Sequence, residues 1–195
     1  MTELALLISN AQQRENKIEL LLCSTGQHRE ILEQVMSVFN ATLDLVSEVI
    51  CENQLLSKSI SRSFDIVSKV ISAYLTDVVV VQGDTISNFT TGLAAFYLYT
   101  PVVYLEARLS KGYTNSLFPK ELNYKTIGCK AHWHFTLKLL AKNNLIKEGA
   151  ESKKMFITDN TLVDATEIDR SIWQQSPSGN VFSNYFLGKK LEYIK

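Results

Sequence analysis

The amino-acid sequence predicts an α/β fold in which helices cover a mostly parallel sheet of doubly wound type. Apolar, β-branched segments alternate along the chain with segments of helical periodicity, and no internal repeat interrupts this alternation. Repeated strand-then-helix units favour parallel strands that are joined by right-handed crossovers. The 195 residues, of which 46% are hydrophobic, suffice for one domain with a substantial core or at most two small ones.

The first half of the chain contains three predicted helices and three predicted strands. Apolar residues at helical spacing predict helices over residues 2–13, 29–39 and 55–74. Apolar runs predict strands over residues 18–23, within 43–50 and over 77–82. The last of these strands contains four consecutive valines without polar alternation, so we expect it to be covered on both faces.

The second half repeats the same alternation. Short apolar runs predict strands over residues 101–105, 133–136 and 154–158. Helical spacing and capping residues predict helices over residues 86–99, 121–130, 137–147 and 160–170, with a loop over 107–119. We expect the domain to span residues 1–170. Residues 171–195 are predicted to form an irregular tail, because they contain Ser-Pro-Ser-Gly and no clear period.

The charge balance and the cysteines exclude several classes of protein. Lysines and arginines number 20, as do aspartates and glutamates, so no overall field attracts nucleic acid or an anionic membrane. The three cysteines, Cys23, Cys51 and Cys129, are widely separated and predict neither a disulfide framework nor a zinc site. The apolar run over residues 4–8 is too short to span a bilayer. We therefore expect a cytoplasmic protein without nucleic-acid or membrane partners.

The sequence gives no support for a cofactor or a metal. It contains neither a GxGxxG segment nor a Walker sequence, which argues against a nicotinamide cofactor or a nucleoside triphosphatase. Cys129, His132 and His134 are spaced closely enough to suggest metal ligands, but no fourth ligand accompanies them. We expect no metal site and interpret the cluster as coincidence.

Three polar clusters are expected to meet at one edge of the sheet. Thr25–His28, Gly83–Thr85 and Glu106 each follow a predicted strand, and ligands bind in open α/β sheets at the carboxyl ends of the strands. Two carboxylates in one cleft can hold sugar hydroxyls or divide the roles of acid and base. The alternative for Asp84 is that it, or Thr85, caps the helix that follows.

These residues resemble the non-hydrolysing UDP-N-acetylglucosamine 2-epimerase family. Five segments carry the resemblance in order and at matching separations: residues 24–30, 81–85, 105–107 with Gly112, 118–119 with Glu121 and Asn123, and 156–158 with 160–161 and 164–165. The resemblance implies a Rossmann-like domain that is one half of a two-domain, glycosyltransferase-B-like fold. It also implies an isomerase that interconverts UDP-N-acetylglucosamine and UDP-N-acetylmannosamine by elimination and re-addition of UDP.

The resemblance also implies roles for individual residues. The positions that match the family's acids at the reacting sugar are Asp84, Glu106 and Glu121, so we expect these to be catalytic. The expected substrate-binding residues are Gln27, His28 and Asn123. A candidate effector site comprises Gln27, Glu30 and Arg62. The implied partners are a UDP-sugar and, for assembly, a second copy of the chain or a complete homologue.

The sequence departs from the family pattern at its start and in its cations. The family's first strand and its Gly-Thr-Arg-Pro-Glu segment have no counterpart, so two sheet edges are left either to join or to stay open. Arg108 stands where a small residue is expected, while Ser110 and Tyr124 each replace an arginine. A diphosphate leaving group needs fixed positive charge. The alternative to an active epimerase is therefore a truncated, catalytically inactive family remnant that binds ligand or mediates assembly.

Overall fold

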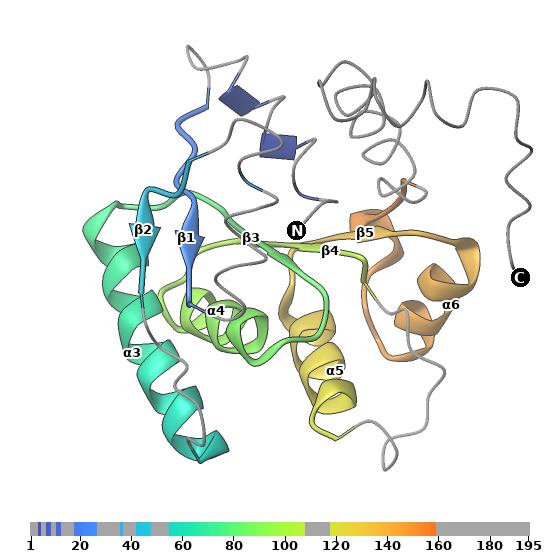
Figure 1. Cartoon of the computed structure of the whole chain (residues 1–195). Helices are drawn as coiled ribbons and strands as arrows, with labels where there is room; N and C mark the ends of the chain where they lie inside the picture. The colour runs from blue at the N-terminus through green and yellow to red at the C-terminus, as the bar shows by residue number, and fades with distance from the viewer. Residues whose placement is uncertain are drawn as a thin grey trace, which may run out of the picture. The chain divides into compact units, whose positions relative to one another are not determined.

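The computed structural model describes residues 18–26, 42–47, 55–107 and 118–158, together with residues 4, 7, 8, 11, 12 and 36. The chain divides into two compact units. One comprises residues 1–22, 28–43 and 160–195, and the other comprises residues 23–27 and 44–159. All of the labelled helices and strands in Figure 1 belong to the second unit.

The second unit contains two parallel sheets with helices between their strands. The strands of the first sheet are β1 (Cys23–Ser24) and β2 (Leu45–Val46). The second sheet has the order β3 (Val79–Gln82), β4 (Val102–Leu105), β5 (Trp133–Thr136) and β6 (Met155–Ile157), and every pair in it is parallel. The helices are α3 (Leu56–Ala73), α4 (Ile86–Tyr97), α5 (Lys120–Lys130) and α6 (Leu139–Lys147), and a 3-10 turn spans Ser152–Lys154.

The predicted alternation of strands and helices is confirmed from residue 55 to residue 158, apart from residues 108–117, which lie outside the described part. The strand predicted over 18–23 is wrong in extent, because pairing with the two-residue β2 is confined to Cys23 and Ser24. In the other unit, Leu4, Leu7, Ile8, Ala11, Gln12 and Met36 are helical, in line with the helices expected there. The helix expected over 160–170 and the tail over 171–195 lie outside the described residues.

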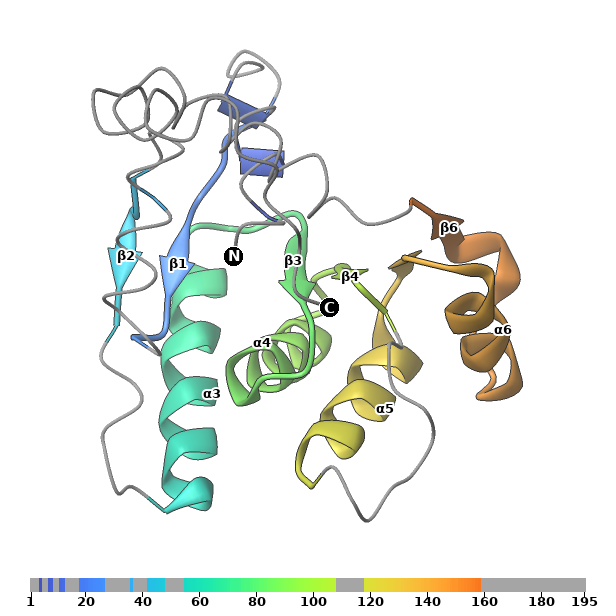
Figure 2. The same ribbon diagram turned by 45° about the vertical axis from the view of Figure 1, so that its right-hand side comes forward.

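The two sheets of the second unit remain separate. Among the described strands, β1 pairs only with β2, and β3 pairs only with β4. Figure 2 shows β1 and β3 running in the same direction. In the part of the chain that is described, β1 and β3 therefore do not join the two sheets by strand pairing.

The valine run of β3 is buried on one face only, so the expectation that both faces are covered is wrong. Val79 and Val81 are 8% and 2% exposed, whereas Val78 and Val80 are 41% and 50% exposed. The buried valines pack in the core with Ala94 and Ala95 of α4. The run thus reflects the β preference of valine more than burial on two sides.

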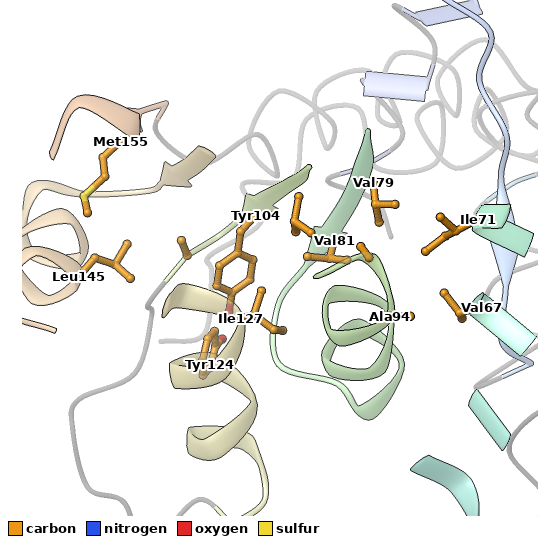
Figure 3. Packing of buried hydrophobic residues seen from close by; sticks show 13 residues of the cluster. Val67, Ile71, Val79, Val81, Ala94, Tyr104, Tyr124, Ile127, Leu145 and Met155 are labelled. Atoms are coloured by element: carbon orange, nitrogen blue, oxygen red, sulfur yellow. The ribbon is translucent and has the colours of Figure 1, made fainter. Parts of the chain in front are cut away.

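The main core is continuous from α3 to β6, as Figure 3 shows. Its buried members include Val67 and Ile71 of α3, Ala94 of α4, Tyr104 of β4, Ile127 of α5, Leu145 of α6 and Met155 of β6. One polar contact lies within the helix layer, where the Ser63 and Thr90 hydroxyl oxygens are 2.5 Å apart. Both side chains are fully buried, so this hydrogen bond satisfies hydroxyls that would be costly to leave unpaired. It fixes how α3 lies against α4.

Gly92 in α4 offers a test of the contact between α4 and α5. It lines a small apolar cavity of ≈ 10 Å³, and a Cβ added there would lie 3.6 Å from Cγ1 of Ile127, an ordinary van der Waals distance. We expect Gly92→Ala to raise the free energy of unfolding by about 1 kcal/mol, because glycine is a poor residue for a helix interior. Urea denaturation measures this change.

Gly128→Ala in α5 is the matched control for Gly92→Ala. A Cβ at Gly128 would lie 3.2 Å from Cδ2 of Leu145, so this leucine must move to admit it. The gain in helix propensity is offset by this crowding, and we expect the smaller stabilisation here. A Gly92→Ala variant that is no more stable than the natural chain would contradict the packing described for α4.

Candidate active site

The turn after β3 presents Asp84 at the carboxyl end of the sheet. Gly83 has a φ of 77°, a conformation that glycine adopts without a steric penalty. Thr85 is the residue that caps α4, since its Oγ1 accepts a hydrogen bond from the Asn88 backbone N at 3.3 Å. The interpretation of Asp84 as the helix cap is therefore wrong. Its carboxylate remains available for another role.

Glu106 lies at the same edge of the sheet as Asp84. The parallel register pairs Gln82 with Leu105, so Glu106 follows β4 at the level at which Gly83 follows β3. Glu106 has a φ of 54°, in the left-handed region, where a residue with a Cβ is strained. Its side chain is half-buried. The acid thus occupies a backbone conformation that glycine would adopt more easily.

Glu121 is the third acid and lies in the first turn of α5. Its side chain is fully buried, and Nζ of Lys125 lies 3.9 Å from its Oε1, one helical turn further along. The positive end of the helix dipole and this lysine both favour a negative charge at Glu121. A buried carboxylate needs such support, because burial without a partner is strongly unfavourable.

The first turn of α5 also contacts Asp84. Nζ of Lys120 lies 3.7 Å from Oδ2 of Asp84, and Nδ2 of Asn123 donates a hydrogen bond to the Asp84 carbonyl oxygen at 2.8 Å. Lys120 is 60% exposed, so its ion pair contributes only a few tenths of a kcal/mol, on the order of other surface pairs. One helical turn therefore carries Glu121 and holds the segment that carries Asp84.

The turn after β1 reaches the start of α4. The Gly26 backbone N donates to Oγ of Ser24 at 3.2 Å, which shapes the turn, and Oγ1 of Thr25 lies 2.6 Å from Oγ of Ser87. The first predicted polar cluster thus contacts α4, the helix that begins directly after the second cluster, Gly83–Thr85.

The remaining predicted site residues are not brought into this arrangement by the described structure. Gln27, His28 and Glu30 lie outside the described residues. Arg62 is exposed on α3.

Sequence reasoning missed several residues that shape the site. They are Lys120, Lys125, Asn88 and Tyr104. The spacing of Glu121 and Lys125 is a recognisable signal, because an acid and a base four residues apart share a helix face. Tyr124, which stands where the family pattern has an arginine, is 8% exposed, and its ring centroid lies 6.4 Å from that of Tyr104. This position therefore contributes to the core.

The histidines near β5 do not form a metal centre within the described residues, where no group of three potential ligands is found. His134 is 2% exposed, and its Nε2 donates to the Gly128 carbonyl oxygen at 2.7 Å. Cys129 is exposed. His134 is thus a core residue that links β5 to α5.

Comparisons with known proteins identify the family. The model of the UDP-N-acetylglucosamine 2-epimerase family matches residues 10–191. The chain belongs to this family. It is 36% identical over 153 residues to the UDP-N-acetylglucosamine 2-epimerase of Neisseria meningitidis serogroup A, an alignment that covers 78% of this chain and 41% of the relative. The family resemblance inferred from the sequence is confirmed.

Solved structures of UDP-GlcNAc 2-epimerases share the fold. The N. meningitidis UDP-GlcNAc 2-epimerase bound to UDP-GlcNAc matches with a TM-score of 0.87 and 31% identity, over 97% of this chain and 51% of that one. The Methanocaldococcus jannaschii enzyme in complex with UDP-GlcNAc and UDP matches with a TM-score of 0.84 and 27% identity, over 94% and 50%. The chain of this epimerase family member therefore spans about half the length of these relatives. Among the described helices, none is long and apolar enough to cross a bilayer.

His134 predicts a pH dependence of stability in this epimerase-family chain. Burial lowers the pKa of His134 below its ordinary value of 6.5, and the charge of Lys154 acts in the same direction. The unfolded chain therefore binds a proton near this pH that the folded chain does not. The stabilisation that comes from keeping His134 neutral is fully present above the pKa of this histidine in the unfolded chain. It decreases as the pH falls from that value toward the lower pKa of His134 in the folded chain. Urea midpoints measured across this range should decline toward acid.

His134→Gln keeps a donor for the Gly128 carbonyl oxygen but removes the group that titrates. The urea midpoint of this variant should therefore fall less steeply toward acid than that of the natural chain. The matched control is His132→Gln, because His132 is exposed. If the urea midpoint falls equally steeply with pH in the natural chain and in His134→Gln, His134 is not the source of the pH dependence.

Glu106→Gly tests the strained backbone after β4. A residue with a Cβ in the left-handed region costs about 1–2 kcal/mol, so glycine at this position should raise the free energy of unfolding by about 1 kcal/mol. Glu106→Gln keeps the Cβ and serves as the control, with no such gain expected. A glycine variant less stable than the glutamine variant in urea denaturation would rule out backbone strain at Glu106.

Proposed function

We propose that this chain carries the sugar-reacting site of a UDP-N-acetylglucosamine 2-epimerase and interconverts UDP-N-acetylglucosamine and UDP-N-acetylmannosamine. The observation that carries the proposal is the arrangement of Asp84, Glu106 and Glu121. Two of these acids follow adjacent parallel strands, and the third lies on the helical turn that holds Asp84. Membership of the epimerase family supports this assignment.

The proposed reaction requires proton transfer at C2 of the sugar and departure of UDP from C1. A carboxylate takes the C2 proton while the C1–O bond breaks and UDP leaves with the bonding electrons. UDP then adds back to C1 while a proton is delivered to C2 on the opposite face, which inverts that centre. Several acids at one site suit this sequence, since a base is needed on one face and an acid on the other.

The substrate would be held by residues around the same edge of the sheet. In the sequence, Gln27 and His28 directly follow the described turn, whose Thr25 contacts Ser87 at the start of α4. We place them among the groups that serve substrate binding. The family pattern implies the same role for Asn123, whose side chain donates instead to the Asp84 carbonyl oxygen. Gln27, Glu30 and Arg62 form the proposed effector site. The protein partners in this proposal are a second copy of the chain or a complete homologue.

A second candidate function is ligand binding or assembly without catalysis. Among the described residues of the site, Lys120 and Lys125 are cations, and each lies within 4.0 Å of a carboxylate oxygen. A departing diphosphate needs positive charge that is aimed at it. Cations already paired with the acids are less able to supply this charge, and this observation favours the non-catalytic alternative.

The two functions are separated by incubating the purified chain with UDP-N-acetylglucosamine in D₂O. We expect proton NMR to show loss of the sugar C2 proton signal and formation of UDP-N-acetylmannosamine. Glu121→Gln should lower this rate by about a hundredfold or more, the usual effect of removing an acid-base group. Glu151→Gln is the matched control, because Glu151 is 68% exposed and pairs with Lys154 away from the three acids.

A rise in melting temperature with UDP-N-acetylglucosamine but without exchange or product would favour the binding module. Neither turnover nor a shift in melting temperature at millimolar ligand would contradict the epimerase proposal for this chain.

A further inference from the structure

We propose that Asn123 is a positioning residue, which fixes Asp84 through its backbone carbonyl group and does not contact the sugar nucleotide. This inference rests on the proposed function, because it assigns Asn123 a task in the site where Asp84 acts. The family pattern implies that Asn123 binds the substrate, and this proposal replaces that role with the positioning of Asp84. The role is carried by the hydrogen bonds of the turn after β3.

Three consecutive carbonyl oxygens of this turn each accept a hydrogen bond from a side chain. Asn88 of α4 donates to Gln82, Tyr104 of β4 donates to Gly83 at 3.3 Å, and Asn123 of α5 donates to Asp84 at 2.8 Å. These donors come from three different elements. The turn is therefore held from three directions, which limits both its translation and its rotation.

The Asp84 carbonyl is free to accept this bond because it lies outside the helix. The first backbone hydrogen bond of α4 runs from the Phe89 N to the Thr85 carbonyl oxygen. The helix therefore does not use the carbonyl of the preceding residue. A flexible glycine stands on the other side of Asp84, so neither neighbour alone fixes its orientation. The amide of Asn123 supplies the missing constraint.

The amide donor of Asn123 is engaged by the turn after β3. Asn123 is 4% exposed, and its Nδ2 is directed at the backbone of the turn. Its own backbone N donates to the Pro119 carbonyl oxygen at 3.2 Å, which holds it within the first turns of α5. Glu121 lies two residues earlier on the same helix. Asn123 thus couples the position of Asp84 to the helix that carries Glu121.

This coupling matters for a reaction that moves protons between sugar and carboxylates. A displacement of about 1 Å from a mutation can cost about a hundredfold in rate, whereas it changes substrate affinity little if the binding groups stay in place. Asn123→Asp has the same shape but lacks the donor. It should lower kcat for UDP-N-acetylglucosamine epimerisation by about tenfold to a hundredfold, with KM changed less than about twofold.

Asn123→Gln keeps an amide donor and should recover part of kcat. Tyr104→Phe removes the neighbouring donor without adding charge, and it should give the same change in kcat without a change in KM. The matched control is Asn143→Asp, an identical change at an exposed position of α6. A rise in KM with unchanged kcat in Asn123→Asp would overturn the proposal, because it would make Asn123 a substrate ligand.

A spectroscopic measurement keeps this test separate from the test of the proposed function. The backbone ¹³C′ resonance of Asp84 should shift in Asn123→Asp and not in Asn143→Asp, whether or not the chain turns over. An inactive natural chain with this shift would count against the epimerase proposal and support the anchoring of Asp84. An Asp84 resonance that is unchanged in Asn123→Asp would overturn the anchoring itself.

Discussion

The parallel pairing of β3 with β4 is the constraint on which the candidate site depends. Gln82 lies opposite Leu105, so the chain leaves both strands at the same level of the sheet. A shift of one residue would exchange the buried and exposed faces of β3 and would bury Val80 in place of Val81. The burial that selects this register therefore also brings Asp84 and Glu106 to one edge.

The helix α5 completes the site because the core holds it against β4. Ile127 and Tyr124 pack in the same cluster as Tyr104, and Gly128 accepts the hydrogen bond of the buried His134. These contacts lie in the middle and last turns of α5. They place its first turn, with Glu121 and Asn123, beside the segment of Asp84. Residues far from the acids thus determine where the acids meet.

The sequence predicted β3–β6 and α3–α6 to within a few residues, because turn and capping residues bound these elements, whereas it overestimated the extent of β1. It predicted the convergence of Asp84 with Glu106, because parallel strands share a carboxyl edge. It could not predict the exposure of Val80, since a run of valines has the same appearance whether one face or both are buried. It also could not show that Asn123 reaches the Asp84 carbonyl, because that bond joins residues 39 positions apart and depends on how α5 docks.

The cations that lie near Asp84 and Glu121 are lysines, and this determines the electrostatics of the site. Lys120 and Lys125 are 60% and 40% exposed, so their flexible ammonium groups can reach solvent as well as the carboxylates. An ammonium group is a point charge, whereas an arginine fork can hold two phosphate oxygens in a fixed geometry. A diphosphate at this edge would compete with Asp84 and Glu121 for the same two lysines. Since both ammonium groups already lie near carboxylate oxygens, the lysines stabilise the two acids first and leave less positive charge for an anion at this edge.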